Sequence, residues 1–526
     1  MFHLRITHDD ITTDREWAWA ANRWRCGSSW IAPYRHDLTE QTALTDGIHT
    51  AFISAVRLAG TTPGRPEIEQ VSPASYGRRI REIRASRGDW VTVEISPGQA
   101  IRIKTGPECT APQYLAAQDG VLHGSWDLMN LRDHQDHNRL DHLAVTRHLA
   151  LRARYTAATF WQDIRLLTER STAHFGQDGP LIIQFPEAAE HSRARSLQDG
   201  ADPVPLFLDL LSRSLSRIPW KGSRTAVQLS GGMDSTVVAL ALRTAPQGAG
   251  VTAGTVILDA ERGVQQSERR SLILEYIASG WSSVTVRATD HLPYGPTSRY
   301  SRRTWISPYQ DIYADALDTL SGRFTDHGVR AVFTGIGGDE LMATTEAEDH
   351  GGWGGFERAD TPPWLGPAAK AVLPDIDTAI TPAAVVPETS LMAKTVCGPA
   401  FMRRGIWPVH PLTDPLLVRF CEWTPLEWRE KKRLLREVIG RTGMPPQVAR
   451  PPIAENFRQI ITVAMRQHGV PRIRTILDAG SPLIEARLIA PDGLATVADR
   501  LEAGTPVDGD HEVVFALLAD SALVQR

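Results

Sequence analysis

Two short stretches of this sequence combine glycines, hydroxyls and acids in a pattern suited to holding phosphate. The first, Leu229-Ser230-Gly231-Gly232-Met233-Asp234-Ser235, follows an apolar run and precedes residues with helical character. Glycines let a backbone approach a ligand closely, and the free N–H groups at the start of a helix attract anions. Asp234 would repel a phosphate unless a cation lay between them. This stretch therefore predicts a nucleotide phosphate bound together with a divalent metal ion.

The second stretch is Thr334-Gly335-Ile336-Gly337-Gly338-Asp339-Glu340-Leu341, which also follows an apolar run. If both runs are strands of one parallel sheet, ligands lie past their carboxyl ends, and Asp339 can face Asp234. Two carboxylates beside phosphates suit Mg²⁺, which usually takes one or two carboxylates plus phosphate oxygens and water. Neither stretch matches the Walker-type loop or G-x-G-x-x-G, so those two common phosphate loops are excluded here.

The elements that must position these residues alternate between strand and helix. Strands are predicted over 226–229, 255–258, 283–286 and 331–334, and amphipathic helices over 267–279 and 312–320. Repeated βα units predict a parallel sheet with helices on both faces. The first half has another pattern, with a β-hairpin over 90–103 and a helix over 141–151.

Length and composition limit the class of protein. A chain of 526 residues is too long for one compact core, and the aperiodic stretch 176–205 is interpreted as a linker between domains spanning 1–200 and 201–526. The net charge of −4 argues against nucleic acid as the main partner. Neither a membrane span of about 18 apolar residues nor a signal peptide is indicated, so a cytoplasmic protein without a membrane partner is expected. The four cysteines contain no C-x-x-C pair, which indicates neither a zinc site nor a disulfide framework.

Three further stretches bear on the site. Residues 344–382 are rich in Gly, Pro, Asp and Trp and are interpreted as a long, mobile insertion, either a lid or a surface loop without consequence. Pro411-Leu412-Thr413-Asp414-Pro415 follows, and then a helix predicted over 430–438 that carries Lys431 and Lys432. A basic helix start is usually only a solvated face, but this chain has six lysines in all, which makes the pair stand out.

Taken together and in this order, these stretches resemble the asparagine synthetase superfamily, in which an ATP-pyrophosphatase domain adenylates a carboxylate so that an amine can attack it. The resemblance implies ATP and Mg²⁺ as cofactors, with Asp234 and Asp339 as metal ligands and Lys432 as the catalytic residue that stabilises charge on pyrophosphate. It implies that ATP is contacted by Leu229, Ser230, Gly231, Gly232, Asp234, Ser235, Leu258, Gly335, Gly337 and Lys432. The implied fold class is α/β, a degenerate Ntn-hydrolase-like αββα amino-terminal domain followed by an ATP-pyrophosphatase (adenine nucleotide α hydrolase-like) parallel-sheet domain.

The chain departs from this family at three places. Phe2 stands where the glutamine-hydrolysing members need a cysteine as the first mature residue, so ammonia from glutamine is not expected. Ile336 stands where asparagine synthetases carry a glutamate and β-lactam synthetases a tyrosine that helps take a proton from the amine. The region around Pro452 lacks the family lysine that stabilises the acyl transition state. His410 and Glu388 are therefore candidates for assisting the proton transfer.

A glutaminase-inactive first domain, a long insertion and the stretch Gly405-Ile406-Trp407-Pro408-Val409 are most similar to the lasso-peptide macrolactam cyclases. That resemblance implies a ribosomal precursor peptide whose Asp or Glu side chain is adenylated before the core's α-amine closes an isopeptide ring. A leader peptidase and a leader-recognition protein are the implied partners. Two alternatives remain: a small-molecule amide or β-lactam-type synthetase, and a non-catalytic scaffold. The paired acids Asp234 and Asp339 argue against the scaffold.

Overall fold

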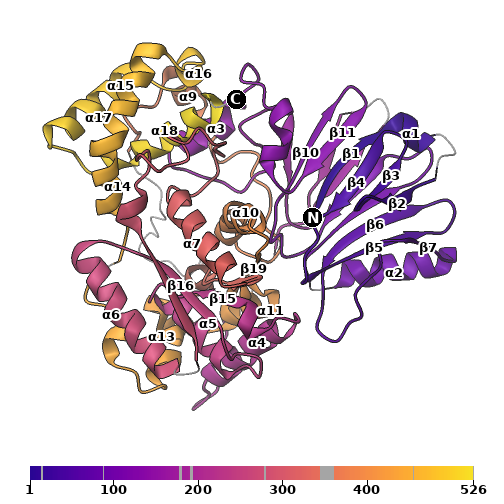
Figure 1. Ribbon diagram of the computed structural model, residues 1–526, viewed down its shortest axis with the longest axis horizontal. Helices are drawn as coiled ribbons and strands as arrows, with labels where there is room; N and C mark the ends of the chain where they lie inside the picture. The colour runs from indigo at the N-terminus through magenta and orange to yellow at the C-terminus, as the bar shows by residue number, and fades with distance from the viewer. Residues whose placement is uncertain are drawn as a thin grey trace.

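The structure is a computed structural model that describes residues 1–12, 16–86, 88–176, 180–189, 194–277, 280–343, 360–453 and 455–524. Within these ranges the chain is a mixed α/β protein with three sheets. Two seven-stranded sheets lie in the first half, and a five-stranded parallel sheet lies in the second (Figure 1). Among these residues no helix is both long enough and apolar enough to cross a membrane.

The two sheets of the first half pack face to face. Leu4 and Ile31 of one sheet share a core with Phe52 and Val93 of the other. The first sheet has the order β12 (Ile164–Leu167), β10 (Gln113–Gln118), β11 (Val121–Ser125), β1 (Phe2–Thr7), β4 (Ser29–Pro33), β3 (Arg23–Cys26) and β2 (Ala18–Ala20). The second has the order β14 (Ile182–Gln184), β13 (Thr172–Phe175), β9 (Ile101–Thr105), β8 (Trp90–Ile95), β6 (Thr50–Val56), β5 (Thr39–Thr45) and β7 (Ile68–Gln70).

Helices cover the outer faces of this sandwich. α2 (Pro73–Ala85) packs Ile80 against Leu44 and Ile53 of the second sheet. On the other side, α3 (His142–Leu149) and the short helix over Leu128–His134 share a core with Tyr114 of the first sheet. The predicted hairpin is confirmed, since β8 and β9 pair antiparallel with Val93 opposite Ile103. The predicted helix is also confirmed, and it begins after Asp141, whose carboxylate accepts a hydrogen bond from the Ala144 N–H.

The predicted linker over 176–205 is wrong in part. Ile182–Gln184 forms strand β14, which pairs with β13 in the second sheet, and α4 (Val204–Ser216) begins at the end of the stretch. A strand of three residues is too short to show an alternating pattern, which is why composition alone suggested a linker. The division into 1–200 and 201–526 stays a prediction.

The parallel sheet has the order β17 (Ser282–Arg287), β16 (Thr252–Ile257), β15 (Thr225–Gln228), β18 (Ala331–Phe333) and β19 (Trp407–Val409). The four predicted strands are confirmed, and every pairing in the sheet is parallel. The sequence did not predict β19 as a strand. It has three residues with Pro408 at its centre, and proline lacks the N–H that a strand donates.

Helices cover both faces of this sheet. One face carries α4, α5 (Met233–Thr244), α6 (Ala260–Ile277) and α13 (Arg433–Gly440), and the other carries α7 (Ala314–Asp326) and α10 (Glu388–Met402). The predicted helix over 267–279 is part of α6, which begins seven residues earlier, and its last two predicted residues lie outside the described residues. The predicted helix over 312–320 is α7.

The residues from Arg458 to Val524 form a helical cluster, drawn mainly in yellow at the upper left of Figure 1. It contains α14 (Arg458–Ala464), α15 (Val470–Ala479), α16 (Pro482–Glu485), α17 (Pro491–Ala503) and α18 (Val513–Val524). α9 (Pro367–Val372) and α3 pack against this cluster.

The predicted insertion over 344–382 has two parts. Residues 344–359 lie outside the described residues, so a lid there stays a prediction. From 360 onward the prediction of a mobile segment is wrong. Trp364 is fully buried and donates its indole N–H to Leu149 O at 3.0 Å, and Arg147 Nε donates to Ile376 O at 2.9 Å. The Gly- and Pro-rich composition indicated a loop, but residues of this segment contact Arg147 and Leu149, about 200 positions earlier in the chain.

Candidate active site

The loop after β15 has the geometry of an anion site. Gly231 has a φ of +89°, in the left-handed region that favours glycine. Ser230 Oγ accepts a hydrogen bond from the Gly232 N–H at 3.2 Å, and Ser235 Oγ donates to Gly232 O at 3.0 Å. Gly232 is the N-cap of α5 and has no side chain to cap the helix. The first N–H groups of α5 are therefore free of a side-chain acceptor and face the loop with the positive end of the helix dipole.

The loop after β18 packs directly against this first loop. A Cβ atom added at Gly338 would lie 2.3 Å from Asp234 Cγ, and one added at Gly335 would lie 3.0 Å from the Ser235 N. No residue larger than glycine fits at position 338 without moving Asp234. The glycines of the second stretch thus let the two loops touch at one edge of the sheet.

Lys432 joins the two acids that these loops carry. Its Nζ lies 2.8 Å from both carboxylate oxygens of Asp234 and 2.6 Å from Oδ1 of Asp339. Asp234 is mostly enclosed, whereas 77% of the Asp339 side chain is exposed. The structure therefore brings together Asp234, Asp339 and Lys432, three residues that lie up to 198 positions apart in the sequence.

The electrostatics of this cluster favour a cation between the two acids. Burial raises the pKa of the Asp234 carboxyl; Lys432 opposes that rise, while Asp339 and Glu340 add to it. Burial lowers the pKa of the Lys432 ammonium, but its contacts with Asp234 and Asp339 outweigh burial and raise that pKa above its ordinary value. Two carboxylates that converge on one cation form a donor set that fits Mg²⁺, which completes its shell with phosphate oxygens and water.

An unusual backbone directs Lys432 toward the acids. Lys431 and Lys432 have φ values of +49° and +57°, and both lie in the left-handed region that is uncommon for residues with a side chain. The predicted helix over 430–438 accordingly begins only at Arg433, with Lys432 as its N-cap. Strained residues of this kind are frequent at functional sites.

Two other predicted ATP contacts have their backbone groups already engaged. The Leu229 N–H donates to Gly254 O at 2.8 Å, and Leu229 O accepts from Arg270 Nε at 3.1 Å. The Leu258 N–H donates to Gln266 Oε1 at 2.8 Å. Gly335 lies against Asp234, as described above, and Gly337 has a φ of +100° and lies against Leu412 and Thr413.

Among the described residues, neither candidate for proton transfer forms a hydrogen bond or ion pair with the three-residue cluster. His410 is buried, its Nδ1 lies 2.7 Å from Thr334 Oγ1, and its Nε2 has no hydrogen-bond partner among the described residues. Burial, and then the charge of Lys394, holds the pKa of His410 well below its usual range. Glu388 is exposed in the first turn of α10 and makes no hydrogen bond or ion pair to a described residue of the cluster. Their roles stay predictions.

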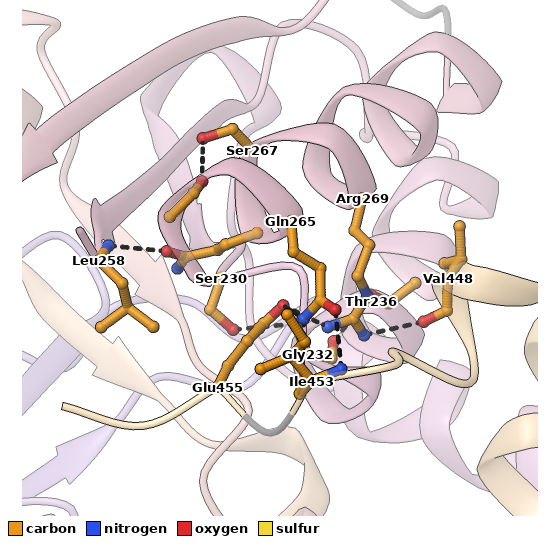
Figure 2. Close-up of polar contacts among 12 residues, drawn as sticks. Ser230, Gly232, Thr236, Leu258, Gln265, Ser267, Arg269, Val448, Ile453 and Glu455 are labelled. Carbon is orange, nitrogen blue, oxygen red and sulfur yellow. Dashed lines mark hydrogen bonds and ion pairs between the residues drawn. The ribbon is translucent and has the colours of Figure 1, made fainter. Parts of the chain in front are cut away.

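Four polar side chains of α6 are buried beside the first loop and were not predicted as site residues: Gln265, Gln266, Arg269 and Arg270. In Figure 2, Gln265 and Arg269 point away from the helix toward Val448, Ile453 and Glu455. Gln265 Nε2 donates to Ile453 O and its Oε1 accepts from the Ile453 N–H, both at 2.9 Å. Arg269 Nη1 donates to Glu455 Oε1 at 2.8 Å, and its Nη2 donates to Val448 O at 2.9 Å.

A sequence signal for this set was present. Gln265 and Arg269 are four residues apart, as are Gln266 and Arg270, which is the spacing of two polar stripes on one helix. The helix was predicted to begin only at residue 267, so Gln265 and Gln266 lay outside it and the spacing was not noticed. Gln265 and Arg269 hold Val448, Ile453 and Glu455 against α6, beside the phosphate loop (Figure 2).

One comparison with known proteins found a match for part of the chain. Residues 207–375 match the family model described as asparagine synthase. This segment begins within α4 and includes both glycine loops, Asp234 and Asp339, while Lys432 lies beyond its end. No curated protein matched the chain. Members of the matched family are ATP-dependent, AMP-forming carbon–nitrogen ligases. The chain therefore carries an asparagine synthase domain, which supports its place in the asparagine synthetase superfamily.

Proposed function

We propose that this protein is an ATP-dependent ligase that activates a carboxylate as its adenylate, releases pyrophosphate, and joins the acyl group to an amine with release of AMP. The observation that carries the proposal is the meeting of Asp234, Asp339 and Lys432 beside the uncapped start of α5. No other part of the described chain combines two converging acids, a partly buried lysine and free helix N–H groups at a sheet edge.

Each group at the site has a task in this chemistry. The loop Ser230 to Ser235 and the start of α5 bind the phosphates through N–H and hydroxyl groups. Asp234 and Asp339 would hold Mg²⁺, which when bound offsets the charge of the phosphate oxygens. Lys432 stabilises the charge that develops on the departing pyrophosphate. The amine then attacks the acyl carbon, and AMP leaves.

Within this class, we propose that the substrate is a precursor peptide and that the product is a macrolactam. An Asp or Glu side chain of the peptide is the acyl donor, and the core's α-amine is the nucleophile. Ile336 has no proton to exchange, so the proton route of asparagine and β-lactam synthetases does not apply here. Holding both reacting groups in one enclosed peptide supplies the proximity that can be worth about 7–11 kcal/mol in an intramolecular attack. A leader peptidase and a leader-recognition protein would act with it.

The test measures pyrophosphate release from ATP and Mg²⁺ with a candidate core peptide from a neighbouring gene. Peptide-dependent release, with a product lighter by one water, is the expected result, and Asp234→Asn is expected to abolish both. Asp202→Asn is a matched control, because Asp202 is an exposed acid paired with Arg441 away from the site. Release with a small amino acid and with no peptide would instead identify a small-molecule synthetase. A protein that does not bind ATP at all would be a scaffold.

A further inference from the structure

A single side chain of α6 bridges two backbone groups at the end of strand β16. Gln266 Oε1 accepts a hydrogen bond from the Leu258 N–H at 2.8 Å, and Gln266 Nε2 donates to Val256 O at 3.1 Å. Leu258 and the bond to its nitrogen are visible at the left of Figure 2. All three residues are buried. The carboxamide oxygen therefore accepts from the Leu258 N–H, and the carboxamide nitrogen beside it donates to Val256 O, two residues earlier.

This backbone pair lies next to the phosphate loop. β16 pairs with β15, the strand that leads into Ser230 and Gly231. A Cβ atom at Gly231 would lie 3.3 Å from Gln266 O, so the backbone of Gln266 touches the loop itself. In parallel sheets ligands lie past the carboxyl ends of adjacent strands. A nucleotide whose phosphates occupy the loop after β15 would thus have its base near the end of β16.

The edge of adenine has the same polarity as the carboxamide of Gln266. Adenine N1 accepts a hydrogen bond and the adjacent 6-amino group donates one, as Oε1 and Nε2 of glutamine do. Guanine presents the reverse order, an N1–H donor and an O6 acceptor. Placed on this backbone pair, guanine would set its N1–H against the Leu258 N–H and its O6 against Val256 O.

We propose that Gln266 is a built-in substitute for adenine, which occupies the backbone pair that reads the base of ATP and is displaced when ATP binds. The proposal rests on the ATP-dependent function proposed above. In the absence of nucleotide, the carboxamide satisfies two buried polar groups that would be destabilising if left without a partner. The same pair selects adenine over guanine. Gln266 therefore lowers the affinity for ATP by the free energy of its own two hydrogen bonds, whereas the Leu258 N–H and Val256 O set the specificity.

The test compares Gln266→Ala and Gln266→Asn with the wild-type protein by calorimetric titration with ATP and Mg²⁺. Asparagine keeps the amide but is one methylene too short to reach both groups. Both variants are expected to melt at a lower temperature without nucleotide and to bind ATP roughly tenfold more tightly, which corresponds to about 1.4 kcal/mol. Gln265→Ala is the matched control. It removes a similar two-point contact from the same helix, to Ile453 instead of to β16, and is expected not to tighten ATP binding.

A second measurement needs no variant. The wild-type protein is titrated with GTP and with the triphosphate of purine riboside, which lacks the 6-amino group. Both are expected to bind at least tenfold more weakly than ATP. The proposal about Gln266 is overturned if the wild-type protein binds ATP and the purine analogue with equal affinity. It is also overturned if both Gln266 variants bind ATP as tightly as the wild type or more weakly. Either result leaves the ligase proposal standing. A wild-type protein that binds no ATP overturns both.

Discussion

At the scale of single residues, Lys432 differs from its neighbour Lys431 only in where its side chain lies. Both have left-handed backbones, but Lys431 is exposed, whereas Lys432 contacts two carboxylates. Basic residues at a helix start usually form a solvated face, and the contact with acids from two distant loops distinguishes Lys432 from that case.

Replacing Lys432 is therefore expected to harm catalysis more than folding. Lys432→Ala should lower the rate of pyrophosphate release by about 100- to 1,000-fold, the usual effect of removing one preorganised group that stabilises transition-state charge. Lys431→Ala is the control and should keep a rate close to that of the wild type. Steady-state kinetics with ATP measures both. Equal losses in the two variants would show that position 432 has no special role.

The effect of replacing Gly338 also depends on a single contact. Gly338→Ala places a Cβ 2.3 Å from Asp234 Cγ, so the two loops must move apart. We expect a loss of about 1–3 kcal/mol in the free energy of unfolding, and a loss of ATP binding, because Asp234 shifts with the loop. Urea unfolding and titration with ATP measure the two effects.

Gly322→Ala is the matched control for this substitution. Gly322 lies inside α7, and a Cβ there would meet no atom within 4 Å. Since alanine favours a helix interior over glycine, this variant should be more stable by about 0.5–1 kcal/mol and should bind ATP normally. A Gly338→Ala protein that behaved in the same way would contradict the close packing of the two loops.

At the scale of elements, α6 packs on the sheet and also bonds to two other parts of the site through its side chains. Gln266 and Arg270 bond to the ends of the strands, while Gln265 and Arg269 bond to the segment over 448–455. Because residues 449–453 and 455 form no helix or strand, their position depends on those side chains.

Arg269→Ala is expected to release the segment over 448–455. Arg269 is almost fully buried and paired with Glu455, and removing one partner of a buried ion pair typically costs about 3–5 kcal/mol. Backbone amides of 448–453 should exchange hydrogen faster, while those of β15 should keep their protection. Hydrogen-exchange mass spectrometry measures this. Arg441→Ala, which removes an exposed ion pair with Asp202, should leave the exchange of 448–453 unchanged.

At the scale of the whole molecule, the two halves share one core and several polar contacts. The largest hydrophobic cluster runs from Leu4 and Phe52 of the sandwich to Val227 and Val237 of the parallel-sheet half. Arg403 forms a bidentate pair with Asp127 across the halves, at 2.6 and 2.7 Å. Such a continuous core predicts that the halves unfold together.

His36, which is buried, and His148, which is partly buried, make this shared stability sensitive to acid. Burial lowers the pKa of His36 and of His148 to about 4. Each folded pKa is thus below its unfolded value, so the unfolded chain binds more protons between about pH 6.5 and 4. Stability is present above about pH 6.5 and falls as the pH drops through this window, by up to about 1.4 kcal/mol per pH unit for each histidine.

Urea unfolding at pH 7, 6 and 5 tests this expectation. His148→Gln retains a donor for Phe515 O, which lies 3.1 Å from the ring Nε2, but it does not titrate. Its stability should fall less steeply with acid than that of the wild type. His327→Gln, at an exposed position after α7, should leave the slope unchanged. Equal slopes for all three proteins would show that His148 is not held neutral by burial.

Local patterns in the sequence were enough to predict four of the five strands of the parallel sheet and its two loops. Apolar runs followed by Ser230-Gly231-Gly232 and Gly337-Gly338-Asp339 predicted strands, turns and one shared edge, because each feature depends on residues next to one another in the chain. The hairpin of β8 and β9 was predictable for the same reason. The location of Asp234 opposite Asp339 followed from the parallel topology.

Only the tertiary structure decided the contacts between segments far apart in the sequence. The burial of Trp364, the bonds of Gln266 to β16 and of Gln265 to Ile453, and the strand β19 all depend on partners that no local pattern specifies. Composition suggested a mobile loop for 360–382 and a linker for 176–205, because short strands and isolated buried side chains leave no periodic trace. Long-range packing overrides local preference wherever the apolar area or hydrogen bonds gained exceed the cost of ordering the chain.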